Sequence, residues 1–93
     1  MTDDPPADVL AVLSQLLAET RTALAEGDHD VAEETVTSAE TVATNKLPEG
    51  ERREAVLYGC GRVHSLLDPE DGGVEADVAA EYVAAMERRL PEE

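Results

Sequence analysis

Residues 9–43 read VLAVLSQLLAETRTALAEGDHDVAEETVTSAETVA, and most of the expected fold follows from this stretch. Its first half carries leucine at the three- and four-residue spacing of one helix face, at Leu10, Leu13, Leu17 and Leu24. Its second half repeats that spacing with smaller side chains, at Val31, Ala32, Val36, Ala39, Val42 and Ala43. Gly27 suits a helix C-terminal cap, and Asp28 or Asp30 suits the N-cap of the next helix. The stretch therefore predicts two helices joined by a tight turn.

Two further segments on the C-terminal side have the same helical spacing and are separated by a breaker cluster, Asp68-Pro69-Glu70-Asp71-Gly72-Gly73. We expect helices at about 6–26, 29–46, 50–67 and 74–90, within a single domain 1–93 that has short flexible N- and C-terminal ends. Strand signals are absent, and short connections favour antiparallel neighbours. The expected fold is all-α, a compact four-helix bundle with antiparallel up-down helices. Spacing alone leaves open whether the helices close into a bundle or form an open array.

Residues 27–45 also resemble part of a tetratricopeptide repeat (TPR). Gly27-Asp28, followed by Ala32 and Ala39, is similar to the turn and second helix of that repeat. Thr20 stands where the family prefers glycine, and no second copy follows at the 34-residue period. The resemblance implies a TPR-like helical hairpin with close helix packing, and only weakly a peptide-binding role.

The chain is strongly acidic, with 22 Asp and Glu against 7 Lys and Arg and a formal net charge of −15 on 93 residues. Such charge destabilises a compact state in dilute buffer and is screened in molar salt, where the Debye length is about 3 Å. Lys46 is the only lysine, and Ala, Val and Leu supply most of the apolar content. This composition is similar to that of cytoplasmic proteins from salt-accumulating haloarchaea; an ordinary acidic chain is the alternative.

Several functions are disfavoured by composition. Nucleic-acid affinity comes chiefly from neutralising phosphates, so this charge argues against nucleic acid as a partner. No apolar run approaches the roughly 20 residues that span a bilayer, and an acidic surface disfavours anionic membranes. Cys60 is the only cysteine, which excludes an intramolecular disulfide and suits a reducing cytoplasm. The first residues lack the features of a signal peptide. We expect a cytoplasmic protein without a cofactor.

Residues 45–65 depart from the acidic background. They contain Lys46, Arg52, Arg53 and Arg62 against three glutamates, and also Tyr58 and His64. We expect Arg52, Arg53, Arg62, Tyr58 and His64 to form a partner-binding surface in which the arginines dock carboxylates. The plainer interpretation is local pairing, such as Glu49 with Arg53, at about 0.3–0.5 kcal/mol per pair.

Gly59 and Gly61 interrupt the third helix, at a cost of roughly 0.5–1 kcal/mol each relative to alanine. Close helix packing, within the bundle or across a dimer, is the commoner reason for such glycines. A bend that bares the backbone to a ligand is the alternative.

Cys60 and His64 share a helix face at i and i+4, a spacing that can present two metal ligands. A zinc site needs four ligands, or three and a water, and no second pair is evident unless a twofold dimer combines two. A thiolate–imidazolium pair for catalysis lacks an orienting group other than Asp68. We expect no metal and no enzyme activity, with Cys60 buried and His64 at the boundary of the core.

These observations predict a small protein–protein interaction or assembly module that binds a protein partner or a second copy of itself. The alternative from another class is a metal- or thiol-based regulatory protein that uses Cys60 and His64. A structural subunit of a larger complex is a third interpretation.

Overall fold

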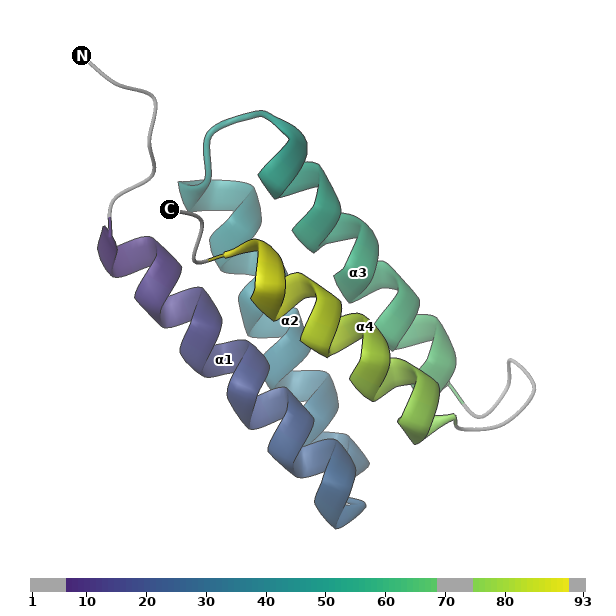
Figure 1. Cartoon of the computed structure of the whole chain (residues 1–93). Helices are drawn as coiled ribbons and strands as arrows, with labels where there is room; N and C mark the ends of the chain where they lie inside the picture. The colour runs from purple at the N-terminus through teal and green to yellow at the C-terminus, as the bar shows by residue number, and fades with distance from the viewer. Residues whose placement is uncertain (1–6, 69–74, 91–93) are drawn as a thin grey trace.

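The structure, a computed structural model, describes residues 7–68 and 75–90. Its four helices are α1 (Ala7–Glu26), α2 (His29–Lys46), α3 (Glu51–Leu67) and α4 (Ala76–Arg89), and the described residues contain no strand. Each helix runs antiparallel to the one before it, as Figure 1 shows. The expected starts of the first and last helices, at residues 6 and 74, lie outside the described residues.

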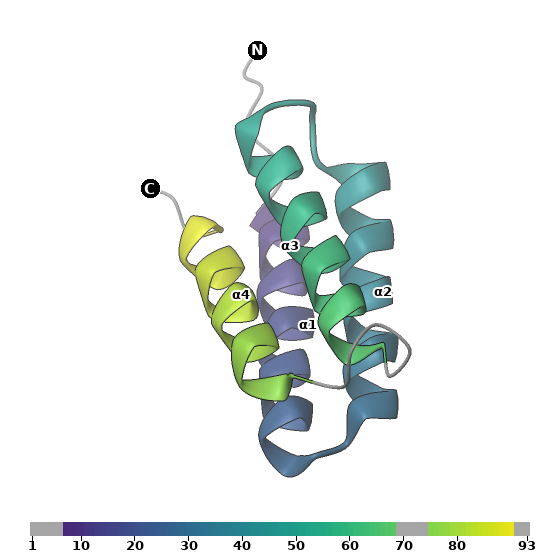
Figure 2. The same ribbon diagram turned by 90° about the vertical axis from the view of Figure 1, so that its right-hand side faces the viewer.

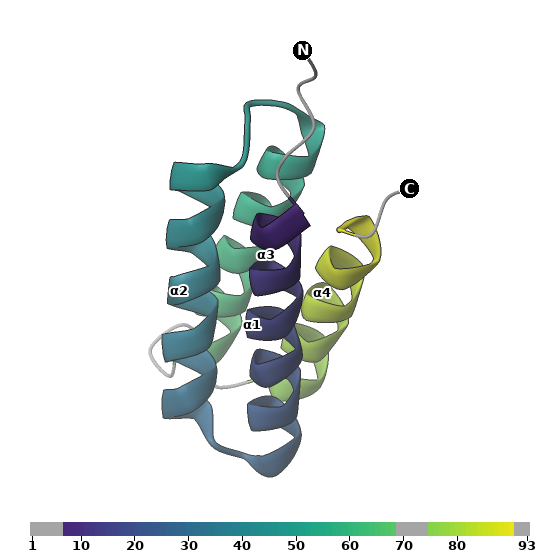
Figure 3. The ribbon, with the colours of Figure 1, turned by 90° about the vertical axis from the view of Figure 1, so that its left-hand side faces the viewer.

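The helices form a closed ring. α1 packs against α2 and α4, and α3 packs against the same two helices. Figure 2 shows α3 between α4 and α2, and Figure 3 shows α1 between α2 and α4 from the opposite side. The all-α four-helix bundle is therefore confirmed, and the contact of α4 with α1 excludes an open array. No helix in the described parts of the chain is both long and apolar enough to cross a membrane.

The core is aliphatic. Its large fully buried side chains come from all four helices, and α2 contributes mainly alanine, with Ala32, Ala39 and Ala43 all at 0% exposure. Small side chains on α2 leave space for the leucines of α1, of which Leu13 and Leu17 are also completely buried. Fully burying a leucine or valine side chain contributes about 1.5–3 kcal/mol, so these residues dominate the stability of a small domain.

The turn between α1 and α2 is set by two residues. Gly27 has a φ of 77°, which a residue without a Cβ adopts at little cost. Its N–H donates to the Leu24 carbonyl, and the Asp28 N–H donates to the Ala23 carbonyl at 2.8 Å, so the helix ends in a Schellman motif. The Asp28 carboxylate accepts from the Val31 N–H and caps α2, so Asp28 takes the capping role that the sequence also allowed for Asp30.

α3 and α4 begin and end close to the expected positions. Gly50 is the N-cap of α3, and α3 therefore starts at Glu51 rather than at residue 50. The Glu75 N–H donates to the Leu66 carbonyl at 2.9 Å, which ties the start of α4 to the end of α3. α4 ends at Arg89, one residue before the expected end, and Leu90 is its buried C-cap.

Polar contacts fasten α1 to both of its neighbours. Thr20 is completely buried, and its hydroxyl lies 2.6 Å from the Thr35 hydroxyl of α2. The Thr20 hydroxyl also lies 2.8 Å from the Leu16 carbonyl, and the Thr35 hydroxyl lies 3.2 Å from the Ala32 carbonyl, so one hydroxyl donates across the helix pair while the other donates to its own helix. On the other side, the Arg21 guanidinium makes a bidentate pair with Glu87 of α4, at 2.8 and 3.1 Å. These contacts fix α1 between α2 and α4.

Candidate protein-binding face

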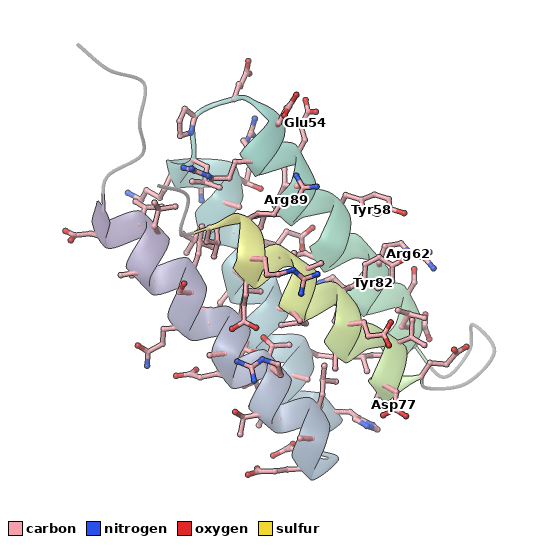
Figure 4. All side chains as sticks on the ribbon, in the orientation of Figure 1. Glu54, Tyr58, Arg62, Asp77, Tyr82 and Arg89 are labelled. Atoms are coloured by element: carbon pink, nitrogen blue, oxygen red, sulfur yellow. The ribbon has the colours of Figure 1, made fainter. Side chains whose placement is uncertain are left out.

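The chain contains two tyrosines and no phenylalanine or tryptophan, and neither tyrosine lies in the core. Tyr58 of α3 is 64% exposed, and Tyr82 of α4 is half-buried. Their ring centroids are 6.4 Å apart in an edge-to-face arrangement. The Arg62 guanidinium lies over the Tyr82 ring, with Cζ 5.7 Å from its centroid. Tyr58, Tyr82 and Arg62 therefore form a cation–aromatic cluster on the outside of the bundle. Figure 4 shows these three residues on neighbouring turns of α3 and α4.

Beside the tyrosines, a groove of about 460 Å³ separates the first half of α3 from the second half of α4. Small and apolar groups line most of it, and three charged residues stand at its edge; the lining comprises Glu51, Glu54, Ala55, Tyr58, Gly59, Tyr82, Ala85, Met86 and Arg89. An apolar groove with charged edges and exposed tyrosine has the composition of a protein-recognition surface.

We call the outer surface of these two helices the α3–α4 face. It comprises Glu54, Tyr58, Gly61, Arg62, Asp77, Val78, Glu81, Tyr82, Ala85, Arg88 and Arg89, all of them exposed or half-buried. Helices α3 and α4 together contain five acidic and five basic residues, whereas α1 and α2 contain seven acidic and two basic residues. The helical residues of α3 and α4 are therefore electrically balanced on a chain with a net charge of −15, although the segment 68–75 between them adds four acidic residues and no basic one.

The predicted binding residues do not all lie on this face. Tyr58 and Arg62 do, but Arg53 turns toward α2, where Nη2 donates to the Thr44 carbonyl at 3.4 Å. That carbonyl belongs to the last turn of α2, whose partial negative charge favours a nearby cation. The Arg53 Nε is buried and has no hydrogen-bond partner among the described residues. Arg53 therefore contacts the α2–α3 corner and lies outside the α3–α4 face.

Arg88 and Arg89, at the end of α4, were not among the predicted binding residues, but they lie beside one that was. Arg52 of α3 lines a shallow depression with Glu51, Arg88 and Arg89. The first turn of α3 meets the last turn of α4 because the two helices are antiparallel. The signal was present in the sequence, since Arg88-Arg89 ends the fourth amphipathic segment, but linking it to Arg52 required the bundle topology.

His64 belongs to the α2–α3 seam. Its Nδ1 lies 3.0 Å from Oε1 of Glu33, and its Nε2 lies 3.4 Å from Oε1 of Glu40. Both carboxylates are on α2, so the ring bridges two positions of that helix and contributes to packing within the chain. It was expected in the partner-binding surface, but these contacts direct it away from the α3–α4 face.

Cys60 is completely buried, and its Sγ lies 4.0 Å from the Met86 Sδ of α4. Burial, with a smaller contribution from the charge of Glu40, raises the pKa of the thiol to about 12. The thiol is therefore protonated at neutral pH, although a thiolate is the form that binds metal or attacks an electrophile. Cys60 contacts Met86 of α4, whereas His64 contacts two glutamates of α2. The described residues contain no cluster of three His, Cys, Asp or Glu that could hold a metal ion.

The two glycines of α3 have different surroundings. Gly59 is buried, and a Cβ at this position would lie 2.5 Å from Sδ and 2.6 Å from Cγ of Met86. The Met86 side chain therefore fills the space that a side chain at this position would need. Gly61 is exposed, and nothing in the described parts of the chain lies within 4 Å of a Cβ built on it. Close packing against the described residues therefore does not explain Gly61.

The chain belongs to the family described as a domain of unknown function, DUF8101, whose profile matches residues 1–92. No curated protein matches the chain, and no solved structure matches it. The family description assigns no activity, so any function has to be inferred from the face itself.

Proposed function

We propose that this protein is a small interaction or assembly module that binds a protein partner through the α3–α4 face. The observation that carries the proposal is the position of Tyr58 and Tyr82. A small domain without other aromatic residues would gain stability by burying them, yet Tyr58 is 64% exposed and Tyr82 is only partly buried against the core. Tyrosine and arginine are the residue types most enriched where binding energy concentrates, and here they are already in contact through Arg62 and Tyr82.

The face is also prepared for binding by its surroundings. Gly59 and Met86 hold α3 and α4 close together beneath the groove, so little ordering of the backbone is required when a partner arrives. The groove accommodates apolar side chains of the partner, while Arg52, Arg88 and Arg89 lie where carboxylates can dock. Binding by occupation of a rigid surface needs no cofactor, and the buried, protonated Cys60 thiol plays no chemical part in it.

We further propose that the module works in a salt-rich cytoplasm, as in a haloarchaeon. The support is the net charge of −15, the single lysine and the aliphatic core. In molar salt the exposed charges are screened to within about 3 Å. A partner must then be held mainly by apolar and aromatic contact, which matches the composition of the groove.

A co-purification experiment with matched variants tests the proposal. Tyr58→Asp places a charge on the face, and Val12→Asp places the same charge on α1 at a side chain that is 47% exposed. Wild type and Val12→Asp should retain the same protein from a cell extract in low and in molar KCl, and Tyr58→Asp should lose it. Circular dichroism would establish that both variants stay helical. Equal retention by Tyr58→Asp would contradict the proposal, and so would the absence of any retained protein from a chain that also stays monomeric.

A further inference from the structure

We infer that the partner that fits the α3–α4 face is a second copy of this chain, bound antiparallel across a twofold axis that passes near Tyr58 and Tyr82. The inference rests on the proposed function, because it identifies the occupant of the same face. Three features of the face support it: its charge pattern, its shape and the open space beside Gly61.

The charges of α3 are arranged symmetrically about its tyrosine and are opposite in sign. Glu54 precedes Tyr58 by four residues and Arg62 follows it by four, so all three share one side of the helix. If α3 of a second copy lies antiparallel with the two tyrosines adjacent, each Glu54 comes to face the Arg62 of the other chain. Each pair then lies about 6 Å along the helix from the axis, at 1.5 Å per residue.

α4 has the same kind of pattern. Asp77 and Glu81 occupy the outer side of its first half, and Arg88 and Arg89 occupy its last turn. Figure 4 shows Asp77 and Arg89 at opposite ends of α4, with Tyr82 between them. The same twofold rotation therefore places the arginines of one copy against the acidic half of the other. A self-complementary surface of this kind is what an isologous dimer requires.

The shape of the face agrees with this arrangement. The groove lies between the first half of α3 and the second half of α4, whereas Val78, 37% exposed, projects from the first half of α4. Antiparallel pairing sets Val78 of each copy opposite the groove of the other. It also brings Gly61, three residues from Tyr58 and open on its outer side, next to the second chain. Close approach between helices explains a glycine that has no packing role within the chain.

The net charge opposes this dimer in low salt, and salt screens that repulsion. The excess acid of the helices lies on α1 and α2, which are a full helix layer behind the face. Helix axes pack about 8–10 Å apart, a spacing at least as long as the Debye length of about 8 Å at physiological salt. At molar salt the separation exceeds the Debye length severalfold, so dimerisation is compatible with the charge of the whole molecule.

Sedimentation equilibrium of the full chain, over a hundredfold range of protein concentration and in low and molar KCl, tests the inference. Wild type should shift reversibly from the 9.9 kDa monomer toward twice that mass. Arg89→Glu sets two acidic residues against each other in the dimer, and Asp77→Arg sets two basic residues against each other. In low salt each variant should associate at least tenfold more weakly than wild type, and an equimolar mixture of the two should recover dimer as the mixed pair.

Controls separate the face from general effects of charge reversal at a helix end. Asp8→Arg is the control for Asp77→Arg, because each reverses an acidic residue in the first turn of a helix. Lys46→Glu is the control for Arg89→Glu, because each reverses a basic residue in the last turn of a helix. Both controls should dimerise like wild type. A dimer that is insensitive to both face variants, or a mixture that stays monomeric, would overturn the inference.

A wild-type chain that stays monomeric throughout would also overturn it, and the co-purification experiment then shows whether the proposed function fails with it. Retention of another protein by wild type but not by Tyr58→Asp would leave the α3–α4 face as a binding surface with a different partner. If this monomeric chain retained no other protein, the dimer inference and the proposed function would both be contradicted.

Discussion

Gly59 and Gly61 are two residues apart on α3, and the structure gives them opposite roles. At Gly59 the missing side chain is what allows Met86 of α4 to pack against the backbone of α3. At Gly61 the missing side chain leaves an open surface beside Tyr58. The same residue type therefore makes room for a neighbouring helix at one position and leaves the helix surface open at the other.

Alanine at each position should separate these roles. Gly59→Ala should lower the free energy of unfolding by about 1–2 kcal/mol, because an overpacking cost of about 1–3 kcal/mol exceeds the gain in helix propensity. Gly61→Ala meets nothing in the described parts of the chain and should raise the free energy by about 0.5–1 kcal/mol. Denaturant unfolding at low protein concentration measures both. Equal effects of the two changes would contradict the packing described at Gly59.

Cys60 makes stability depend on alkaline pH. The pKa of its thiol is raised by burial from an ordinary 9.0 to about 12, so between these values the unfolded chain loses a proton that the native chain keeps. Stability from this group is complete below pH 9 and is lost as pH rises toward 12, at up to about 1.4 kcal/mol per pH unit.

Cys60→Ala should have a flatter pH profile than wild type in that range, although it is less stable at pH 7. Chemical denaturation between pH 8 and 11 gives both profiles, and the difference between them isolates the contribution of the thiol because the two proteins differ only at this residue. A thiol reagent should label native wild type only as fast as the protein opens. Parallel pH profiles, or fast labelling under native conditions, would show that the thiol is accessible and would revive the thiol-based alternative.

At the scale of the elements, polar side-chain contacts join three of the four pairs of neighbouring helices in addition to the aliphatic core. Thr20 and Thr35 join α1 to α2, His64 bridges two glutamates of α2 from α3, and Arg21 pairs with Glu87 between α1 and α4. The α3–α4 pair is the exception, because its aromatic cluster lies on the outside. The outward aromatic cluster therefore distinguishes the α3–α4 pair from the other three pairs of helices.

The threonine pair should show a measurable coupling. Thr20→Val and Thr35→Val should each destabilise the protein by about 1 kcal/mol, the usual net value of a hydrogen bond within a protein. The double variant should cost less than the two single changes together, because both partners of the bond are removed at once. Unfolding of the four proteins in a double-mutant cycle measures the difference. Strict additivity would mean that the 2.6 Å contact contributes no net stability.

At the scale of the whole molecule, charge and topology are linked. The antiparallel ring places the ends of α2 and α4 beside the start of α3, so five of the seven basic residues gather at one end of the bundle: Lys46, Arg52, Arg53, Arg88 and Arg89. Basic residues in the last turns of α2 and α4 complement the partial negative charge of the helix C-termini. The remaining surface is left with the excess acid, and its mutual repulsion opposes folding.

Salt should therefore stabilise the monomer. The free energy of unfolding should rise from low to molar KCl as repulsion among the acidic residues is screened. Glu26→Gln together with Glu34→Gln removes two exposed charges from the acidic half and should make this rise shallower. Thermal unfolding of both proteins across KCl concentrations measures the slopes. A wild-type midpoint that does not change with KCl would contradict the role assigned to the charge.

The sequence by itself determined the elements. Leucine and alanine at helical spacing, the glycine after α1 and the breaker cluster after α3 are local signals, so they placed the four helices to within a residue or two where the structure describes them. It also determined that Cys60 would be buried and that Tyr58 and Arg62 were candidates for binding. These features depend on side-chain type and spacing along one segment, which a linear pattern carries.

Only the tertiary structure decided that α4 closes against α1, that Arg53 and His64 turn inward to α2, and that Tyr82, Arg88 and Arg89 join Tyr58 on one face. The physical reason is that a helix pattern gives the direction of each side chain around its own axis and nothing about which helix lies beside it. The neighbours are chosen by how alanine, leucine and glycine surfaces fit together, and that choice is made by the whole bundle at once.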